Sequence, residues 1–163
     1  MRSCTKSVAF YSDLDVELLV PLDYISHLAS GAMLVGRTQT NGRAYNAVLG
    51  APPGYNVFKN LVDYMAENSN EAYFNNLDYL TSYLKANTTR GFASEGMDTF
   101  KDGRRLLVLT EEFRDARECW DGKDFYGYCS FLTYNNEKLF KSRYADFFGW
   151  ADQKEDMKDE LPG

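Results

Sequence analysis

Residues 8–17, VAFYSDLDVE, run from four apolar or aromatic residues into two carboxylates that stand one residue apart. Alternate side chains of a strand point to the same face. We therefore expect Asp13 and Asp15 to project together from the end of a buried strand. Two converging carboxylates are costly unless positive charge neutralises them. A hard cation, Mn²⁺ or Mg²⁺, prefers oxygen ligands and can also hold phosphates. The simpler interpretation is an acidic turn, because Asp is common in turns.

The composition is that of one folded domain. The chain has 163 residues, of which 44% are hydrophobic, and its formal net charge is −6. With no basic block, nucleic-acid binding through phosphate neutralisation is not expected. No apolar run is long enough to predict a membrane span. We expect a single domain over residues 1–150 and a charged, disordered tail over residues 151–163.

Strands alternate with helical segments along the chain, which predicts an α/β fold. Residues 111–120 are expected to form a short helix or an irregular loop. Residues 138–150 are aromatic and basic, and favour an amphipathic helix with its aromatic side chains on the core. Helices are also predicted at 21–29, 56–67 and 71–86, and strands at 5–11, 16–20, 32–36, 44–49, 105–109 and 126–134.

Two further groups of side chains have a plain interpretation. Cys119 and Cys129 are expected to be free thiols, although they could bridge in an oxidising compartment. Glu111 and Glu112 are expected to lie on a solvated face, as paired Glu residues usually do.

Residues 11–23, YSDLDVELLVPLD, resemble the sugar-binding region of DXD-motif glycosyltransferases, a family that includes mannosyltransferases and capsular polysaccharide transferases. That region has an aromatic residue, Asp-x-Asp, and a hydrophobic stretch ending in Pro-Leu. A second segment, residues 46–58, NAVLGAPPGYNVF, stands where the family has an Asn, an apolar strand and a Pro-Gly turn before a helix.

The resemblance implies a GT-A-like mixed sheet with flanking helices, in an N-terminally truncated member that lacks the first nucleotide-binding strands. It also implies a metal-dependent, retaining transfer of a sugar from a nucleotide-diphosphate donor to an acceptor hydroxyl. The acceptor would be a glycan, a lipid or a protein-linked sugar. Membrane contact and cell compartment stay open: the Golgi or ER lumen for a eukaryotic full-length parent, otherwise the cytoplasm.

The resemblance also assigns roles to residues. Asp15 would ligate Mn²⁺ or Mg²⁺, which would bridge both donor phosphates and stabilise the departing diphosphate. Asp13 would contact the ribose or sugar of the donor, or reach the metal through water. Asn46 and the loop from Gly50 to Gly54 would lie near the donor sugar, where small residues allow close approach.

Two other functions stay open. One is a catalytically incomplete transferase fragment that acts only as a binding module. The other is a phosphatase of the haloacid-dehalogenase type, which also has Asp-x-Asp after a hydrophobic strand. Its motif requires Thr or Val where this chain has Glu17, and a downstream acidic cluster that is missing from the sequence.

Overall fold

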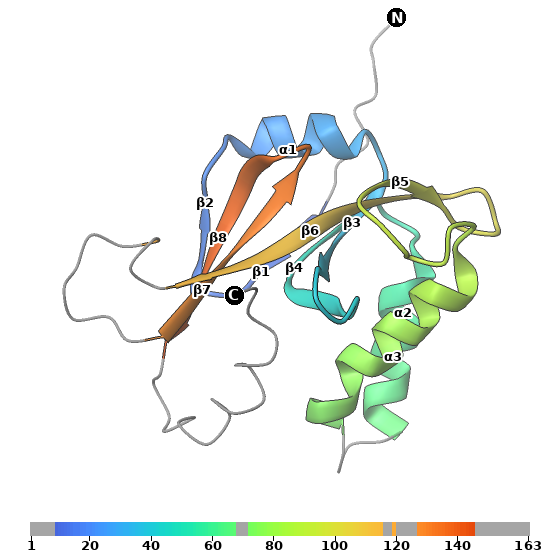
Figure 1. Ribbon diagram of the computed structural model, residues 1–163. Coiled ribbons are helices and arrows are strands. Elements are labelled where there is room, and N and C mark those ends of the chain that lie inside the picture. Colours follow the sequence, from blue (N-terminus) through green and yellow to red (C-terminus); the bar gives the residue numbers. More distant parts are fainter. Residues whose placement is uncertain (1–8, 68–71, 116–118, 120–126, 146–163) are drawn as a thin grey trace, which may run out of the picture.

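The computed structural model describes residues 9–67, 72–115, 119 and 127–145, which form a mixed α/β fold (Figure 1). One curled sheet carries helices on both faces. In chain order the elements are β1 Ala9–Ser12, β2 Val16–Leu18, α1 Leu22–Ala29, β3 Met33–Thr38, β4 Ala44–Ala51, α2 Asn56–Glu67, α3 Ala72–Asn87, β5 Gly96–Thr99, β6 Arg105–Asp115, β7 Gly127–Tyr134 and β8 Glu137–Ala145.

The described strands form a single eight-stranded sheet in the order β1-β4-β3-β6-β7-β8-β2, with β5 pairing to β6. The pair β3–β6 is parallel, whereas the other pairs are antiparallel. The prediction of an α/β fold with a mixed sheet and flanking helices is therefore confirmed.

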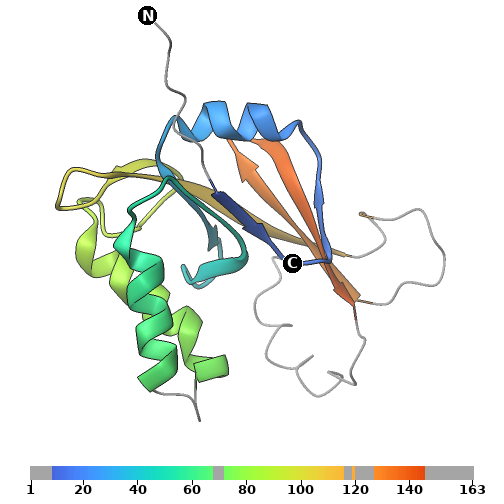
Figure 2. The ribbon, with the colours of Figure 1, turned by 180° about the vertical axis from the view of Figure 1, so that it is seen from behind.

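The sheet has to curl, because its two end strands are neighbours in the sequence. Only residues 13–15 separate β1 from β2, although these strands stand at opposite ends of the strand order. Three linking residues span at most about 14 Å between strand ends. In a flat sheet, six strand spacings would place β1 and β2 about 29 Å apart. Figure 2 shows β1 leading to β2 along the open side of the curled sheet.

The two faces of the sheet carry two separate apolar cores. Alternate residues of a strand point to opposite faces, and in β6 Leu107 and Leu109 pack in one core while Leu106 and Val108 pack in the other. The first core includes Ile25 of α1. The second core includes residues of α2 and α3, and these two helices lie together on the opposite side from α1 (Figure 1).

The three predicted helices are confirmed, but the expectations for residues 111–120 and 138–150 are wrong where the structure describes them. Residues 111–115 continue β6, and β8 takes the place of the amphipathic helix. The cause is the hairpin between β7 and β8. Asn135 and Asn136 have φ of 50° and 65°, the left-handed geometry of a tight two-residue hairpin turn. Residues 1–8 and the predicted tail over residues 151–163 lie outside the described residues.

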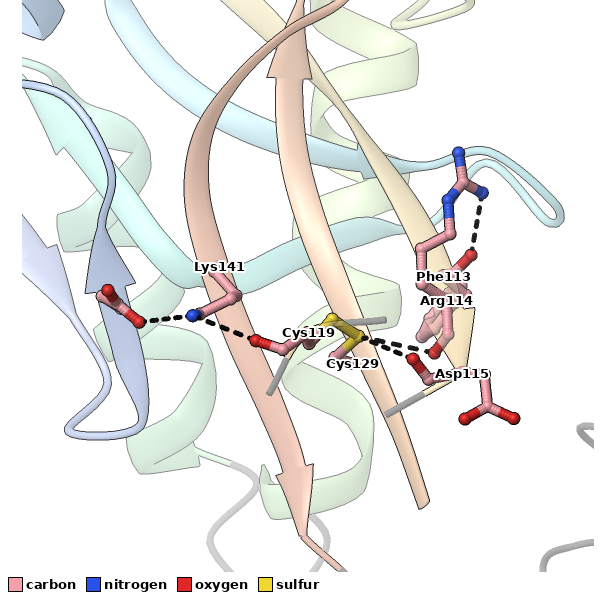
Figure 3. The surroundings of a disulfide bond; sticks show 7 residues. Phe113, Arg114, Asp115, Cys119, Cys129 and Lys141 are labelled. Carbon is pink, nitrogen blue, oxygen red and sulfur yellow. Dashed lines mark hydrogen bonds and ion pairs between the residues drawn. A yellow bond between two sulfur atoms is a disulfide. The ribbon is translucent and has the colours of Figure 1, made fainter. Parts of the chain in front are cut away.

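A disulfide joins Cys119 to Cys129, so the expectation of free thiols is wrong (Figure 3). The two Cα atoms are 6.4 Å apart. Beside the disulfide, Lys141 Nζ donates to the carbonyl oxygen of Cys119 at 3.3 Å and lies 2.7 Å from Glu17 Oε2. Glu17 and Lys141 face each other in the β2–β8 register. This ion pair therefore connects β2, at one end of the sheet, to the disulfide region.

One of the two paired glutamates is part of the interior. Glu111 is 1% exposed and accepts a hydrogen bond from the hydroxyl of Thr38 at 3.1 Å. These two residues are register partners in the parallel pair β3–β6. Glu112 is half-buried and lies 2.7 Å from Arg114 Nη2. The prediction of a solvated face is therefore wrong for Glu111.

Candidate functional site: an apolar groove between β1 and α2

The acidic pair occupies the turn that closes the curled sheet. The N–H of Asp13 donates to the carbonyl oxygen of Ala47 at 2.9 Å, and the N–H of Val16 donates back to the carbonyl oxygen of Asp13 at 3.2 Å. Asp13 is half-buried and Asp15 is exposed. The strand before them is not buried, contrary to the prediction. β1 is an end strand, and of its residues Phe10 alone is even partly covered.

Tyr11 connects this turn to the strand. Its hydroxyl donates to Asp13 Oδ1 at 2.5 Å. That hydrogen bond, then the charge of Asp13, partial burial and the charge of Asp15 raise the pKa of Tyr11. Both carboxylates therefore act on one hydroxyl group. Within the described part of the chain, neither carboxylate forms an ion pair with Lys, Arg or His.

Asn46 and Gly50, which the resemblance placed near a donor sugar, both lie within β4. Asn46 is half-buried there and stands about 13 Å along the strand from Gly50. A Cβ atom on Gly50 would lie 2.8 Å from ring atoms of Phe10. Glycine at position 50 therefore makes room for the ring of Phe10, and a side chain at position 50 would meet packed atoms of Phe10 and Leu34.

Gly54 is the residue of this set that lies at a cavity. It has a φ of +87°, and no atom would contact an added Cβ within 4 Å. It lines an open groove of about 750 Å³ between the β1–β4 pair and α2, a volume suited to a small ligand or a short segment of chain. The other lining residues are Ala9, Phe10, Tyr11, Leu49, Ala51, Pro52, Pro53, Tyr55, Phe58, Leu61 and Val62.

The loop that joins β4 to α2 holds the groove open. The hydroxyl of Tyr55 donates to the carbonyl oxygen of Arg105 at 2.9 Å. Arg104 Nη1 donates to the carbonyl oxygen of Gly54 at 2.9 Å, and its guanidinium carbon lies 4.8 Å from the centroid of the Tyr55 ring. Val57, in the first turn of α2, is 2% exposed. The start of α2 is therefore fixed to the sheet before the helix diverges from it.

The next turns of α2 leave apolar side chains uncovered. Phe58 and Leu61 are only half-buried, and Val62 is 62% exposed. Helical spacing identifies these residues in the sequence as the face that meets the core, so their part in an open groove was missed. The sequence feature that could have revealed the groove is the wide apolar face of α2. The sheet covers only part of that face, so Val62 stays exposed.

The chemistry of the groove is apolar. None of the described residues that line it is Asp, Glu, Lys, Arg or His. The polar side-chain groups of these lining residues are the hydroxyls of Tyr11 and Tyr55, and both donate hydrogen bonds. The groove therefore suits apolar groups, with the carboxylate of Asp13 next to its lining at Tyr11.

The acidic turn offers two carboxylates to a cation. Two carboxylates with substrate phosphates can hold Mg²⁺, and the chain offers Asp13 and Asp15 for this. Nowhere in the described residues do three or more His, Cys, Asp or Glu side chains gather in a way that could hold a metal ion.

The described helices include none with the length and apolar character needed to cross a membrane.

Comparisons with known proteins return no match to a family model, a curated protein or a solved structure. The fold and the groove define the class in structural terms, as an α/β protein with a curled mixed sheet and an apolar groove at the β1 end of that sheet.

Proposed function

We propose that the protein is a binding module whose ligand occupies the groove between β1 and α2. The observation that carries this proposal is the groove itself, which has about 750 Å³ of space and no charged side chain among the described residues that line it. Catalysis needs groups that transfer protons, attack or stabilise charge. Binding of an apolar ligand needs only a shaped apolar surface with a few polar groups at its border.

Exposure of the apolar side chains supports the same function. Tyr11 is 56% exposed and Val62 is 62% exposed, and they stand on the two walls of one groove. Exposed apolar side chains that face one another across a groove offer a surface on which an apolar ligand can bind. A ligand that covers it removes apolar surface from water, at roughly 25 cal/mol per Å².

The test uses a neutral, environment-sensitive dye such as Nile red, so that the net charge of −6 does not repel the probe. We expect saturable binding with one dye per chain. Val62→Asp places a charge on the groove wall and should weaken dye binding at least tenfold. Ser82→Asp, at an exposed position of α3 away from the lining residues, is the matched control. Equal binding by both variants would rule out the groove as the site.

Metal-dependent sugar transfer is the second candidate, because Asp13 and Asp15 share one turn and Asp13 is bonded to Tyr11 of the groove. In this proposal Asp15 would hold Mn²⁺ or Mg²⁺, which neutralises charge on a departing diphosphate. The GT-A fold and the retaining reaction belong to this candidate. Mn²⁺-dependent binding of a nucleotide sugar should be lost in Asp15→Ala and kept in Asp23→Ala, a control in the first turn of α1. Binding that Asp15→Ala leaves unchanged would contradict it.

A further inference from the structure

The open edge of β1 borders the groove. Among the described strands β1 pairs with β4 alone, in the register Ala9↔Ala51 to Ser12↔Val48. Residue pairs of an antiparallel ladder alternate between hydrogen-bonded and non-hydrogen-bonded. Because the N–H of Asp13 donates to the carbonyl oxygen of Ala47, Ala9 and Tyr11 also face β4. The N–H and C=O groups of Phe10 and Ser12 therefore point away from β4, along the free edge.

Apart from its length of four residues, β1 has none of the features that block end strands. Natural sheets block end strands with Lys, Pro, bulges or inward-pointing charges, whereas β1 reads AFYS and pairs with β4 without a register shift. The opposite end of the sheet differs. β2 has three residues, and none of them lines the groove, whereas β1 contributes Ala9, Phe10 and Tyr11 to it. Of the two end strands, β1 is the one suited to accept a further strand.

Side-chain direction connects this edge to the groove. Phe10 packs against the core on the α1 face, so Ala9 and Tyr11 project to the opposite face, where they line the groove. A strand added beside β1 would place every second side chain next to them. Those side chains would be about 6.6 Å apart, and two of them would fit along the four residues of β1.

The charge at the end of β1 indicates which kind of residue should follow the two apolar side chains of the added strand. Asp13 and Asp15 come directly after β1 and form no ion pair with a cation in the described part of the chain. A basic residue on the partner would complement them. The alternative of a free fatty chain would use the apolar groove and leave both the backbone edge and the carboxylates unused.

We infer that the ligand of this groove is an extended peptide segment that adds to β1 as a further strand, with alternate apolar side chains in the groove and a basic residue at Asp13 and Asp15. This inference rests on the proposed function and specifies its ligand class. Main-chain hydrogen bonds to Phe10 and Ser12 would give affinity, and the groove and the acidic turn would give specificity.

The probes are blocked hexapeptides with alternating apolar residues, Ile-Thr-Val-Thr-Lys-Lys and the reversed order Lys-Lys-Thr-Val-Thr-Ile, because the added strand could run in either direction. Fluorescence anisotropy with the full chain is expected to show saturable binding of one of them below about 1 mM. A version methylated on alternate backbone nitrogens, at the edge facing β1, should lose binding. A version with Glu in place of Lys should bind about threefold more weakly or worse.

Ser12→Pro is the decisive variant of the protein. The N–H of Ser12 points to the free edge, where proline is tolerated in a sheet, so the fold should persist. Loss of one main-chain hydrogen bond and obstruction of the edge should weaken peptide binding at least tenfold. Circular dichroism should show that the variant keeps the wild-type fold. Ser12→Ala keeps the N–H group and is the matched control.

The outcomes separate the two proposals. If Nile red binds in the groove but neither peptide binds, the peptide inference fails and the binding module stands. If Nile red does not bind either, both fail. Equal binding of the methylated peptide, or equal binding by Ser12→Pro, shows that no strand is added and overturns the inference. If sedimentation shows a dimer that Ser12→Pro dissociates, the occupant is a second copy of the chain and the inference of a peptide partner is overturned.

Discussion

Replacement of Asp98 should destabilise the turn that places the side chain of Phe92 in the core. Asp98, in β5, is 3% exposed. Its Oδ1 accepts hydrogen bonds from the N–H of Thr99 at 2.7 Å, the hydroxyl of Thr89 at 2.9 Å and the N–H of Arg90 at 3.0 Å. Its Oδ2 accepts from the N–H of Phe92 at 3.4 Å. One carboxylate therefore satisfies four donors in and around the turn before β5.

The loss of stability in Asp98→Ala depends on which hydrogen-bond donors lose their acceptor. Phe92 is fully buried with a φ of +56°, and its N–H keeps a second acceptor in the hydroxyl of Thr88 at 2.9 Å. The N–H groups of Arg90 and Thr99 have no such second acceptor in the described structure. Thr99 is half-buried, so leaving its N–H unpaired costs about 1–3 kcal/mol, whereas Arg90 is exposed and its N–H can bond to water. Asp98→Ala is therefore expected to lose roughly 2 kcal/mol. Asp98→Asn keeps one oxygen acceptor and should lose about half as much.

The pH dependence gives a second readout. Burial by itself would raise the pKa of Asp98, but the hydrogen bonds from Thr99, Arg90 and Thr89 outweigh it and lower the pKa below its usual range. A carboxyl with a lowered folded-state pKa stabilises the fold above its unfolded-state pKa of about 3.9. That stabilisation is lost as the pH falls through the folded-state pKa. The difference between wild type and Asp98→Asn should therefore be largest near neutral pH and shrink below about pH 4.

The assay is urea unfolding of wild type, Asp98→Asn and Asp98→Ala at several pH values, with the unfolding midpoint and m-value fitted separately. The control is Asp102→Ala, because Asp102 is half-exposed in its side chain and pairs locally with Arg104; its effect should stay below about 1 kcal/mol. The reasoning is refuted if Asp98→Ala changes the free energy of unfolding by no more than Asp102→Ala does.

Three smaller predictions follow from the groove and the sheet. Gly50→Ala should displace the ring of Phe10, cost about 1–3 kcal/mol and weaken groove binding of Nile red; unchanged stability would show that β1 is not held as described. The phenol of Tyr11 should titrate above its usual range because it donates to Asp13. Ultraviolet difference titration of wild type against Tyr11→Phe should reveal this tyrosine step, and the step should occur at lower pH in Asp13→Asn. A step at the same pH in Asp13→Asn would contradict the hydrogen bond. Reduction of the disulfide between Cys119 and Cys129 should lower stability by about 3 kcal/mol, measured by thermal unfolding with and without reductant; equal midpoints would contradict the pairing.

Local sequence patterns predicted the helices and most strands because each signal lies within a few residues. Val57, Phe58 and Leu61 keep helical spacing, and α2 forms there. β8 was missed because its decisive signal lies before it, in the left-handed turn at Asn135 and Asn136, while aromatic and basic residues at helical spacing favoured a helix. Tertiary pairing with β7 overrides that local preference.

The candidate site was harder to predict, because its walls come from two parts of the chain. The sequence predicted a metal and donor site from Asp13, Asp15 and Gly54. The structure places Gly54 in the groove and the two carboxylates after β1. Sequence alone did not show that β1 is an end strand. Nor did it show that Val62 would remain uncovered, since both depend on how the curled sheet and α2 diverge.

The most direct test of the account is a two-dimensional NMR titration of the full chain with Nile red, with the signals of the groove residues assigned. Binding in the groove should shift the signals of Ala9, Leu61 and Val62 on its two walls. The signals of Leu139 in the opposite core should stay in place. Shifts confined to residues outside the groove, or no saturable shift at Ala9 and Val62, would contradict the claim that this groove is the binding site.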